Sequence, residues 1–151
     1  MEFPGRATFK NRGGVATNIG VHFFDMLLWI FGASIRQEVH LSTPEKAAGF
    51  LELAKARVRW FLSLDQDDLP KGALEANKRT YRSLSIDGKE VEFSDGFANL
   101  HTAVYKETLS SRGFGLDDVR ASIQVVHDIR HSIPIGLKGE FHPLAKISLK
   151  G

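Results

Sequence analysis

The longest apolar run in this 151-residue chain, Val21 to Phe31, constrains the fold more than any other segment. A polar, glycine-ended stretch precedes the run and Gly32, a natural helix C-cap, follows it, so we predict a helix at about Val15–Phe31. Its second half, Met26–Phe31, has almost no polar face, which predicts a helix buried on several sides at the centre of the domain. The run is about half as long as a membrane-spanning helix must be, so we expect no membrane span.

After this helix the pattern changes to that of strands, in which apolar side chains alternate with others along the segment. The predicted strands are Ile35–Ser42, Gly49–Ala54 and Arg57–Leu64. We predict a hairpin of two strands within Thr80–Phe93. Its turn is expected at Asp87-Gly88, a dipeptide that readily adopts positive φ angles. The charged segment Asp65–Lys78 shows no sustained period, so we predict a long loop there that could serve in binding or as a lid.

Two further helices are predicted, at Phe97–Ser111 and Leu116–His131, the second ended by Pro134. The residues expected to form the buried stripe of the second helix are Leu116, Val119, Ile123 and Val126. The tail is expected to add a short strand at Lys146–Leu149. His127 and His131 lie near a helix C-terminus, where positive charge is favoured, and we interpret them as structural.

Helices that flank one face of a mostly antiparallel sheet predict an α+β fold with an open sheet face. With 42% apolar residues, the chain is long enough for one compact domain, residues 1–151. Phe61 and its neighbours would lie on the second sheet face and need a cover, for which a partner subunit is one candidate.

Composition narrows the class of protein. The net charge of +2 and the pI near 9.0 suit an anionic small molecule and are too weak an excess for nucleic acid. Cysteine is absent, which excludes disulfides, a thiolate nucleophile and cysteine zinc sites. The N-terminus lacks the basic start and apolar region of a secretory signal. We therefore expect a cytoplasmic protein that binds neither nucleic acid nor membrane.

The start of the first predicted helix carries most of the candidate chemistry. Gly13 and Gly14 let the backbone approach a ligand, and Asn18 and His22, four residues apart, project from the same side. Asp25 could accept a hydrogen bond from one imidazole nitrogen of His22 and leave the other nitrogen as a general base. These spacings predict a catalytic histidine with an orienting carboxylate.

Other interpretations of these residues stay open at this point. A histidine on an apolar helix is more often a satisfied core residue than a catalyst. A metal site at His22 and Asp25 is weaker still, because no third ligand lies at a supporting interval, and we predict none. Arg12 beside the glycines is either an anion contact or an ordinary loop arginine.

The segment from Gly13 to Asp25 resembles the Gly-Gly-…-(Asp/Asn)-x-Gly-x-His-x-x-Asp signature that opens the C-terminal domain of Gfo/Idh/MocA oxidoreductases. Further segments resemble the branch of this family that oxidises UDP-N-acetylglucosaminuronic acid at C3. They are Asn-Ile-Gly-Val-His-Phe-Phe-Asp-Met-Leu, Arg-Trp-Phe-Leu-Ser, Asp-Leu-Pro, Tyr-Arg-Ser-Leu-Ser-Ile-Asp-Gly and Arg-Gly-Phe-Gly-Leu-Asp-Asp-Val-Arg. The resemblance covers most of Gly13 to Arg130.

The resemblance implies an open-faced α+β domain that follows a Rossmann domain, with a nucleotide sugar bound between the two. His22 would take the proton of the sugar hydroxyl as hydride leaves for NAD, and Asn18 would hydrogen-bond the same region. Many members carry Asp at the position of Asn18, and an amide exchanges no proton at neutral pH, so Asn18 is expected only to orient. His101, Thr102 and Tyr105 would contact uronate or diphosphate oxygens, unless they form an exposed polar helix face.

The family's dinucleotide-binding motif and the Glu-Lys-Pro motif of its catalytic lysine are not found in these 151 residues. No Gly-x-Gly-x-x-Gly lies between a strand and a helix, and Glu45-Lys46 is not followed by the proline of the family's Glu-Lys-Pro motif. We therefore expect residues 1–14 to lead in from a Rossmann domain outside this sequence, and the chain alone neither to bind NAD tightly nor to turn over. The family resemblance implies a homo-oligomer, a dimer or tetramer, through the open sheet face. The alternative is a non-catalytic sugar-binding or assembly module.

Overall fold

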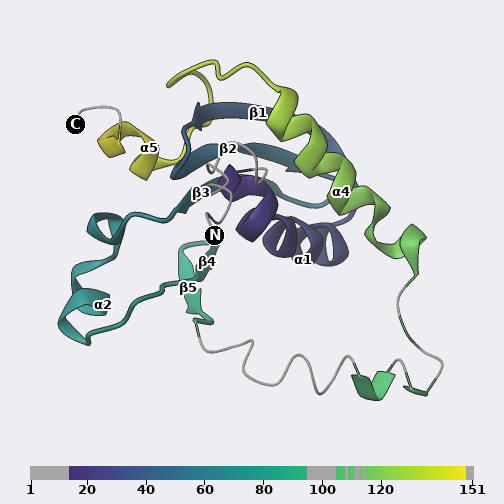
Figure 1. Ribbon diagram of the computed structural model, residues 1–151. Coiled ribbons are helices and arrows are strands. Elements are labelled where there is room, and N and C mark those ends of the chain that lie inside the picture. Colours follow the sequence, from purple (N-terminus) through teal and green to yellow (C-terminus); the bar gives the residue numbers. More distant parts are fainter. Residues whose placement is uncertain (1–13, 95–104, 108, 111–112, 114, 149–151) are drawn as a thin grey trace, which may run out of the picture. The chain divides into compact units, whose positions relative to one another are not determined.

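The computed structural model describes residues 14–94, 105–107, 109–110, 113 and 115–148 (Figure 1). The chain divides into two compact units, Met1–Leu64 with Leu116–Gly151, and Asp65–Gly115. Helices combine with antiparallel strands, which confirms the predicted α+β class. Of the helices in the described ranges, none has the length and apolar character needed to cross a bilayer.

The first helix of the first unit runs as a π-helix, η2 (Ala16–Gly20), into an α-helix, α1 (Val21–Phe31). Gly32 caps it at a φ of 87°, and its N–H donates to the Leu28 carbonyl at 2.9 Å, which confirms the predicted helix and its end. The predicted burial on several sides is wrong, because Trp29 is 86% exposed. The described residues of this unit cover one face of α1, and Phe24 and Leu27 are its buried residues.

Three antiparallel strands form the main sheet, in the order β1 (Ser34–Ser42), β2 (Lys46–Leu53) and β3 (Arg57–Ser63). The three predicted strands are confirmed, although β2 begins three residues before Gly49. A Cβ atom at Gly49 would lie 2.3 Å from the Glu38 carbonyl oxygen of β1. Glycine at this position therefore lets the two strands and the Trp60 ring pack closely.

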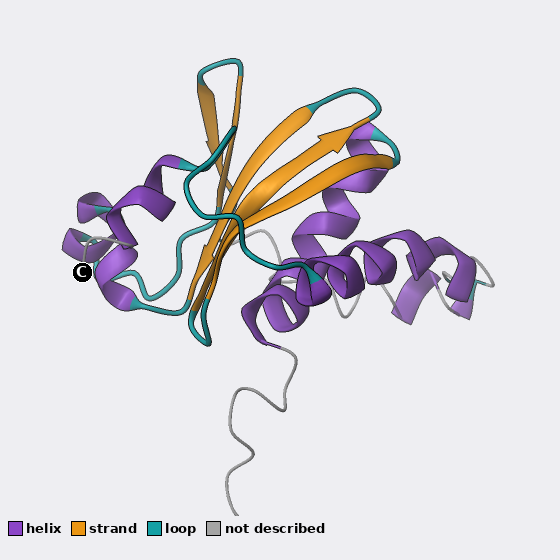
Figure 2. Ribbon diagram, turned by 90° about the horizontal axis from the view of Figure 1, so that it is seen from above, coloured by secondary structure: helices purple, strands orange, loops and turns teal. Residues whose placement is uncertain are grey.

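The helix α4 (Leu116–His131) packs against α1 and η2 and, with them, lies on one side of the sheet (Figure 2). Its predicted bounds are confirmed. Its predicted stripe is wrong in part, because Leu116 and Ile123 are exposed whereas Val126 is buried. The buried residues are Ser122, Val125, Val126 and Ile129. Ser122 is tolerated at this interface because its hydroxyl donates to the Val119 carbonyl at 2.9 Å.

The second face of the sheet is covered in part by the chain's own C-terminal segment. Trp60 and Phe61 are neighbours in β3 and so point to opposite faces. Trp60 meets α1, whereas Phe61 stacks on His142 with ring centroids 5.7 Å apart. Phe61 and Leu137 pack against a small core formed by Leu41, Ala48 and Ala145.

The predicted strand at Lys146–Leu149 is wrong, since the segment forms a helix, α5 (Pro143–Ser148). Proline is favoured at the first turn of a helix, where its missing N–H costs nothing. Nδ1 of His142 accepts the N–H of Leu144 at 3.2 Å, which supports the helix start.

The second unit contains η3 (Gln66–Asp68), α2 (Lys71–Glu75) and the hairpin of β4 (Ser83–Ile86) and β5 (Lys89–Glu92). The hairpin turn is confirmed, with φ of 49° at Asp87 and 78° at Gly88. The predicted loop Asp65–Lys78 instead contains two short helices, the first capped by the Asp65 carboxylate, which accepts the Asp67 N–H at 3.0 Å. The predicted helix at Phe97–Ser111 lies largely outside the described residues, and Tyr105–Glu107 and Leu109 are helical.

Candidate active site

The candidate base lies where the π-helix passes into the α-helix. Asn18 lies within η2 and His22 is the second residue of α1, and both side chains are exposed. His22 is therefore not a buried core histidine. A π-helical turn is rare and occurs often at functional sites.

Close packing against β3 holds this junction in place. A Cβ atom at Gly20 would lie 2.8 Å from Cε2 of Phe24 and 3.0 Å from Cδ1 of Leu62. Phe24 in turn meets Trp60 edge to face. The glycine of the Gly-x-His pattern thus brings the helix onto the sheet, while His22 on the same helix stays exposed.

The predicted partner of His22, Asp25, is also exposed. The described part of the chain contains no hydrogen bond between the His22 ring and the Asp25 carboxylate, so the orienting role of Asp25 stays a prediction.

Gly14 has a φ of 73°, a conformation that side-chain-bearing residues rarely adopt. Glycine at this position thus meets a backbone requirement of the turn into the helix.

The described structure does not test several of the predicted site residues. Arg12, Gly13, His101 and Thr102 lie outside the described residues. Tyr105 is 70% exposed and belongs to the second unit, so its role as a substrate contact is untested.

A groove of about 320 Å³ lies at the opposite end of α1, between α1, β1 and α4. Its lining includes Leu28, Ile35, Gln37 and Gln124, and does not include Asn18 or His22. The groove is therefore distinct from the candidate active site.

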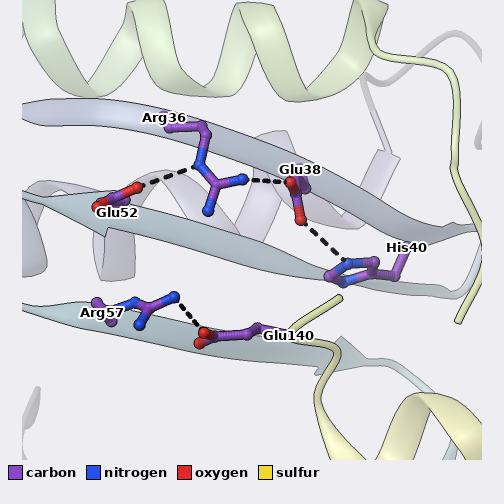
Figure 3. A network of polar contacts seen from close by, with 6 residues as sticks. All are labelled: Arg36, Glu38, His40, Glu52, Arg57 and Glu140. Atoms are coloured by element: carbon purple, nitrogen blue, oxygen red, sulfur yellow. Dashed lines mark hydrogen bonds and ion pairs between the residues drawn. The ribbon is translucent and has the colours of Figure 1, made fainter. Parts of the chain in front are cut away.

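A polar network on the second sheet face was not predicted from the sequence (Figure 3). Arg36 of β1 bonds Glu38 at 2.7 Å and Glu52 of β2 at 3.1 Å, and Arg57 of β3 pairs with Glu140. The strand register could have indicated it, because Glu52 lies opposite Arg36 on one side and Arg57 on the other.

These charged side chains cover an aromatic ring. The guanidinium groups of Arg36 and Arg57 lie 5.2 and 5.6 Å from the ring centroid of Phe50, which is fully buried. His40 is buried beside them, with Nε2 3.6 Å from Oε2 of Glu38. This end of the second face is therefore polar at its surface and apolar beneath.

Comparison with known proteins indicates the family of this chain. Residues 6–70 match the profile of the oxidoreductase family (Gfo/Idh/MocA), C-terminal alpha/beta domain. The chain is similar to the WlbA (WbpB) dehydrogenase from Thermus thermophilus solved with NAD and alpha-ketoglutarate, with 47% identity and a TM-score of 0.83. The structure of that dehydrogenase with NAD and UDP-GlcNAcA gives 46% identity and a TM-score of 0.80.

Both alignments cover 93% of this chain and 48% of the dehydrogenase, so the chain spans about half the length of these solved relatives. The chain therefore belongs to the Gfo/Idh/MocA oxidoreductase family, as its C-terminal α/β domain.

Proposed function

We propose that this chain is the substrate-binding half of an NAD-dependent oxidoreductase that oxidises a nucleotide-sugar acid of the UDP-N-acetylglucosaminuronate type at its C3 hydroxyl. The observation that carries the proposal is the exposed pair of Asn18 and His22 at the junction of η2 and α1. The similarity to a dehydrogenase solved with NAD and UDP-GlcNAcA supports the substrate class.

In this reaction Asn18 and His22 would assist the removal of one proton, that of the C3 hydroxyl. When the C3–H bond breaks, its electron pair leaves as hydride, and NAD, when bound, supplies the acceptor. The C3–O bond becomes a carbonyl only if the hydroxyl proton leaves as well. A neutral imidazole of His22 accepts that proton on a ring nitrogen, and the Asn18 amide orients the same oxygen by hydrogen bonding.

The anionic parts of such a substrate need donors and cations. The residues that we propose for uronate or diphosphate contacts are Arg12, Gly13, Gly14, His101, Thr102 and Tyr105. Backbone N–H groups beside glycines and neutral polar side chains bind such oxygens without requiring a large net charge. The net charge of +2 is compatible with this mode of binding.

The proposal is tested by replacing His22 with Asn in the full-length protein and measuring turnover at saturating NAD and UDP-N-acetylglucosaminuronate. General bases contribute about 100-fold or more, so we expect at least that loss. The control is His142→Gln, a histidine replacement outside the proposed site, which should keep turnover. A loss smaller than about tenfold in His22→Asn would remove His22 as the main base.

The 151 residues alone are expected to bind NAD only weakly and to show no turnover, because the family's cofactor motifs are not among them. Calorimetric titration of this chain with NAD checks the expectation. Binding in the micromolar range would contradict it.

We further propose that the protein self-associates through the part of the second sheet face that the C-terminal segment leaves uncovered. The half-exposed side chains of Arg36 and Arg57 mark this area. Sedimentation velocity of the wild type and of Arg57→Glu is the test, because a charge reversal in an interface weakens association. An unchanged distribution of species would contradict this placement of the interface.

A further inference from the structure

Two histidines on the exposed side of α4, His127 and His131, lie one helical turn apart. Their ring centroids are 4.2 Å apart and the ring planes are inclined by 31°. Both residues are exposed to solvent. Side chains four residues apart on a helix point the same way, so the two rings present their free edges to the same region of solvent.

Each ring already uses one nitrogen within the chain. Nδ1 of His131 lies 2.6 Å from the His127 carbonyl oxygen. A carbonyl only accepts hydrogen bonds, so this contact places a proton on Nδ1 of His131. In the neutral ring, Nε2 of His131 is then a lone-pair donor to any Lewis acid.

The ring of His127 is held in the same way by a side chain. Its Nδ1 lies 3.2 Å from Oδ1 of Asp128, and the amide of Gln124 donates to that same oxygen at 2.7 Å. The carboxylate thus fixes the Nδ1–H tautomer of His127 and leaves its Nε2 free.

When a histidine binds a metal in a protein, its other ring nitrogen usually donates a hydrogen bond to a carbonyl or a carboxylate. This hydrogen bond orients the ring. The position of the pair near the C-terminus of α4 also favours a bound cation, because the last carbonyl groups of the helix carry partial negative charge. The pair therefore differs from two histidines that only pack together, since in both rings the contact at Nδ1 leaves the lone pair on Nε2.

We propose that His127 and His131 chelate a divalent transition metal ion through their two Nε2 atoms, as a surface site independent of the proposed dehydrogenase reaction. Imidazole nitrogen is a preferred ligand of Cu²⁺, Ni²⁺ and Zn²⁺, whereas Mg²⁺ and Ca²⁺ prefer oxygen. Within the described ranges, no three or more His, Asp or Glu residues are grouped to hold a metal. The site thus supplies two ligands and leaves the other coordination positions to water, unlike a closed structural zinc site.

The test is calorimetric titration of the untagged protein with Cu²⁺, Ni²⁺, Zn²⁺ and Mg²⁺. We expect one equivalent of metal, bound most tightly as Cu²⁺, and no binding of Mg²⁺. His127→Asn and His131→Asn should each abolish this binding, because one imidazole alone does not chelate. Asp128→Asn keeps both ligands and should weaken affinity by about tenfold, the lower end of the effect of losing such a supporting group.

The control is His22→Asn, which removes an exposed histidine from another helix and should leave the affinity unchanged. Circular dichroism checks that each variant is folded, and Cu²⁺ broadening of amide signals locates the metal in the wild type. Broadening confined to the end of α4 supports the site. Unchanged affinity in either histidine variant, or broadening centred elsewhere, would overturn the proposal.

Discussion

The ring of Phe24 in α1 meets the ring of Trp60 in β3 edge to face, with centroids 5.2 Å apart and ring planes 77° apart. Both residues are buried. Phe24 lies two residues after His22, so this contact fixes the helix that carries the candidate base against the sheet. A catalytic side chain that is exposed is useful only if its backbone is held, and this aromatic pair is one of the described contacts that hold it.

Phe24→Ala tests the energetic weight of this contact. Removing a buried phenylalanine leaves a cavity, and we expect the free energy of unfolding to fall by about 3–5 kcal/mol. Trp29→Ala on the same helix is the matched control, because Trp29 is 86% exposed and should cost less than about 0.5 kcal/mol. Urea unfolding of both variants gives the comparison. Equal losses would show that the described burial does not determine stability here.

Glycine replacements test the close approaches beneath the site. Gly20→Ala would place a Cβ atom 2.8 Å from the Phe24 ring, and we expect a loss of about 1–3 kcal/mol in unfolding free energy. Gly49→Ala should cost more, because its Cβ atom would meet the Glu38 carbonyl of the backbone at 2.3 Å. Gly72→Ala in α2 has open space and should instead stabilise by about 0.4–1 kcal/mol. A ranking in which Gly20→Ala exceeds Gly49→Ala would contradict this account.

Local signals predicted most of the helices and strands of the fold, and tertiary contacts decided which faces they bury. Asp87-Gly88 and Gly32 act through their own backbone angles, so the hairpin turn and the end of α1 could be predicted from the residues alone. In α4 the periodicity of the apolar residues fits either of two neighbouring faces of the helix as the buried one. The contact with α1 buries the face of Ser122 instead of that of Ile123. The sequence pattern contains no information about that choice.

The candidate site was predictable for a different reason. His22 and Asn18 lie in one short segment with a distinctive pattern, so no knowledge of the tertiary fold was needed to select them. The ion pair of Arg36 with Glu52 joins two strands, and Arg57 lies opposite Glu52 on the third strand. Only the strand register reveals this arrangement. The π-helical turn of η2 also had no sequence signal, and its last residue, Gly20, is the one that packs closely onto β3.

Asn18→Ala separates orientation from proton transfer in the full-length protein. An amide has no titration near neutral pH, so its loss should lower kcat/KM, by about tenfold for one neutral hydrogen bond, without changing the pH profile. His22→Asn should lower kcat/KM by about 100-fold or more, because it removes the proposed base. Steady-state kinetics across pH 5.5–9 measure both. A shifted profile in Asn18→Ala would mean that Asn18 controls the ionisation of the base as well.

The final prediction concerns the C-terminal segment that covers Phe61. Burial of the His142 ring, and secondarily the charge of Arg59, lower the pKa of this histidine below its ordinary value of 6.5. Because the folded-state pKa lies below the unfolded one, the stability that neutral His142 contributes is fully present above pH 6.5. That stability is lost as the pH falls through the folded-state pKa.

Protonation acts at two contacts that this ring makes. It would place a charge in the stack on Phe61 and remove the Nδ1 lone pair that accepts the Leu144 N–H. We therefore expect the unfolding free energy of the wild type to fall more steeply between pH 7.5 and 5 than that of His142→Gln, whose side-chain carbonyl does not titrate. Urea unfolding at a series of pH values gives the two curves, and the other histidines contribute equally to both. Parallel curves would show that protonation of His142 does not loosen the C-terminal segment from the sheet.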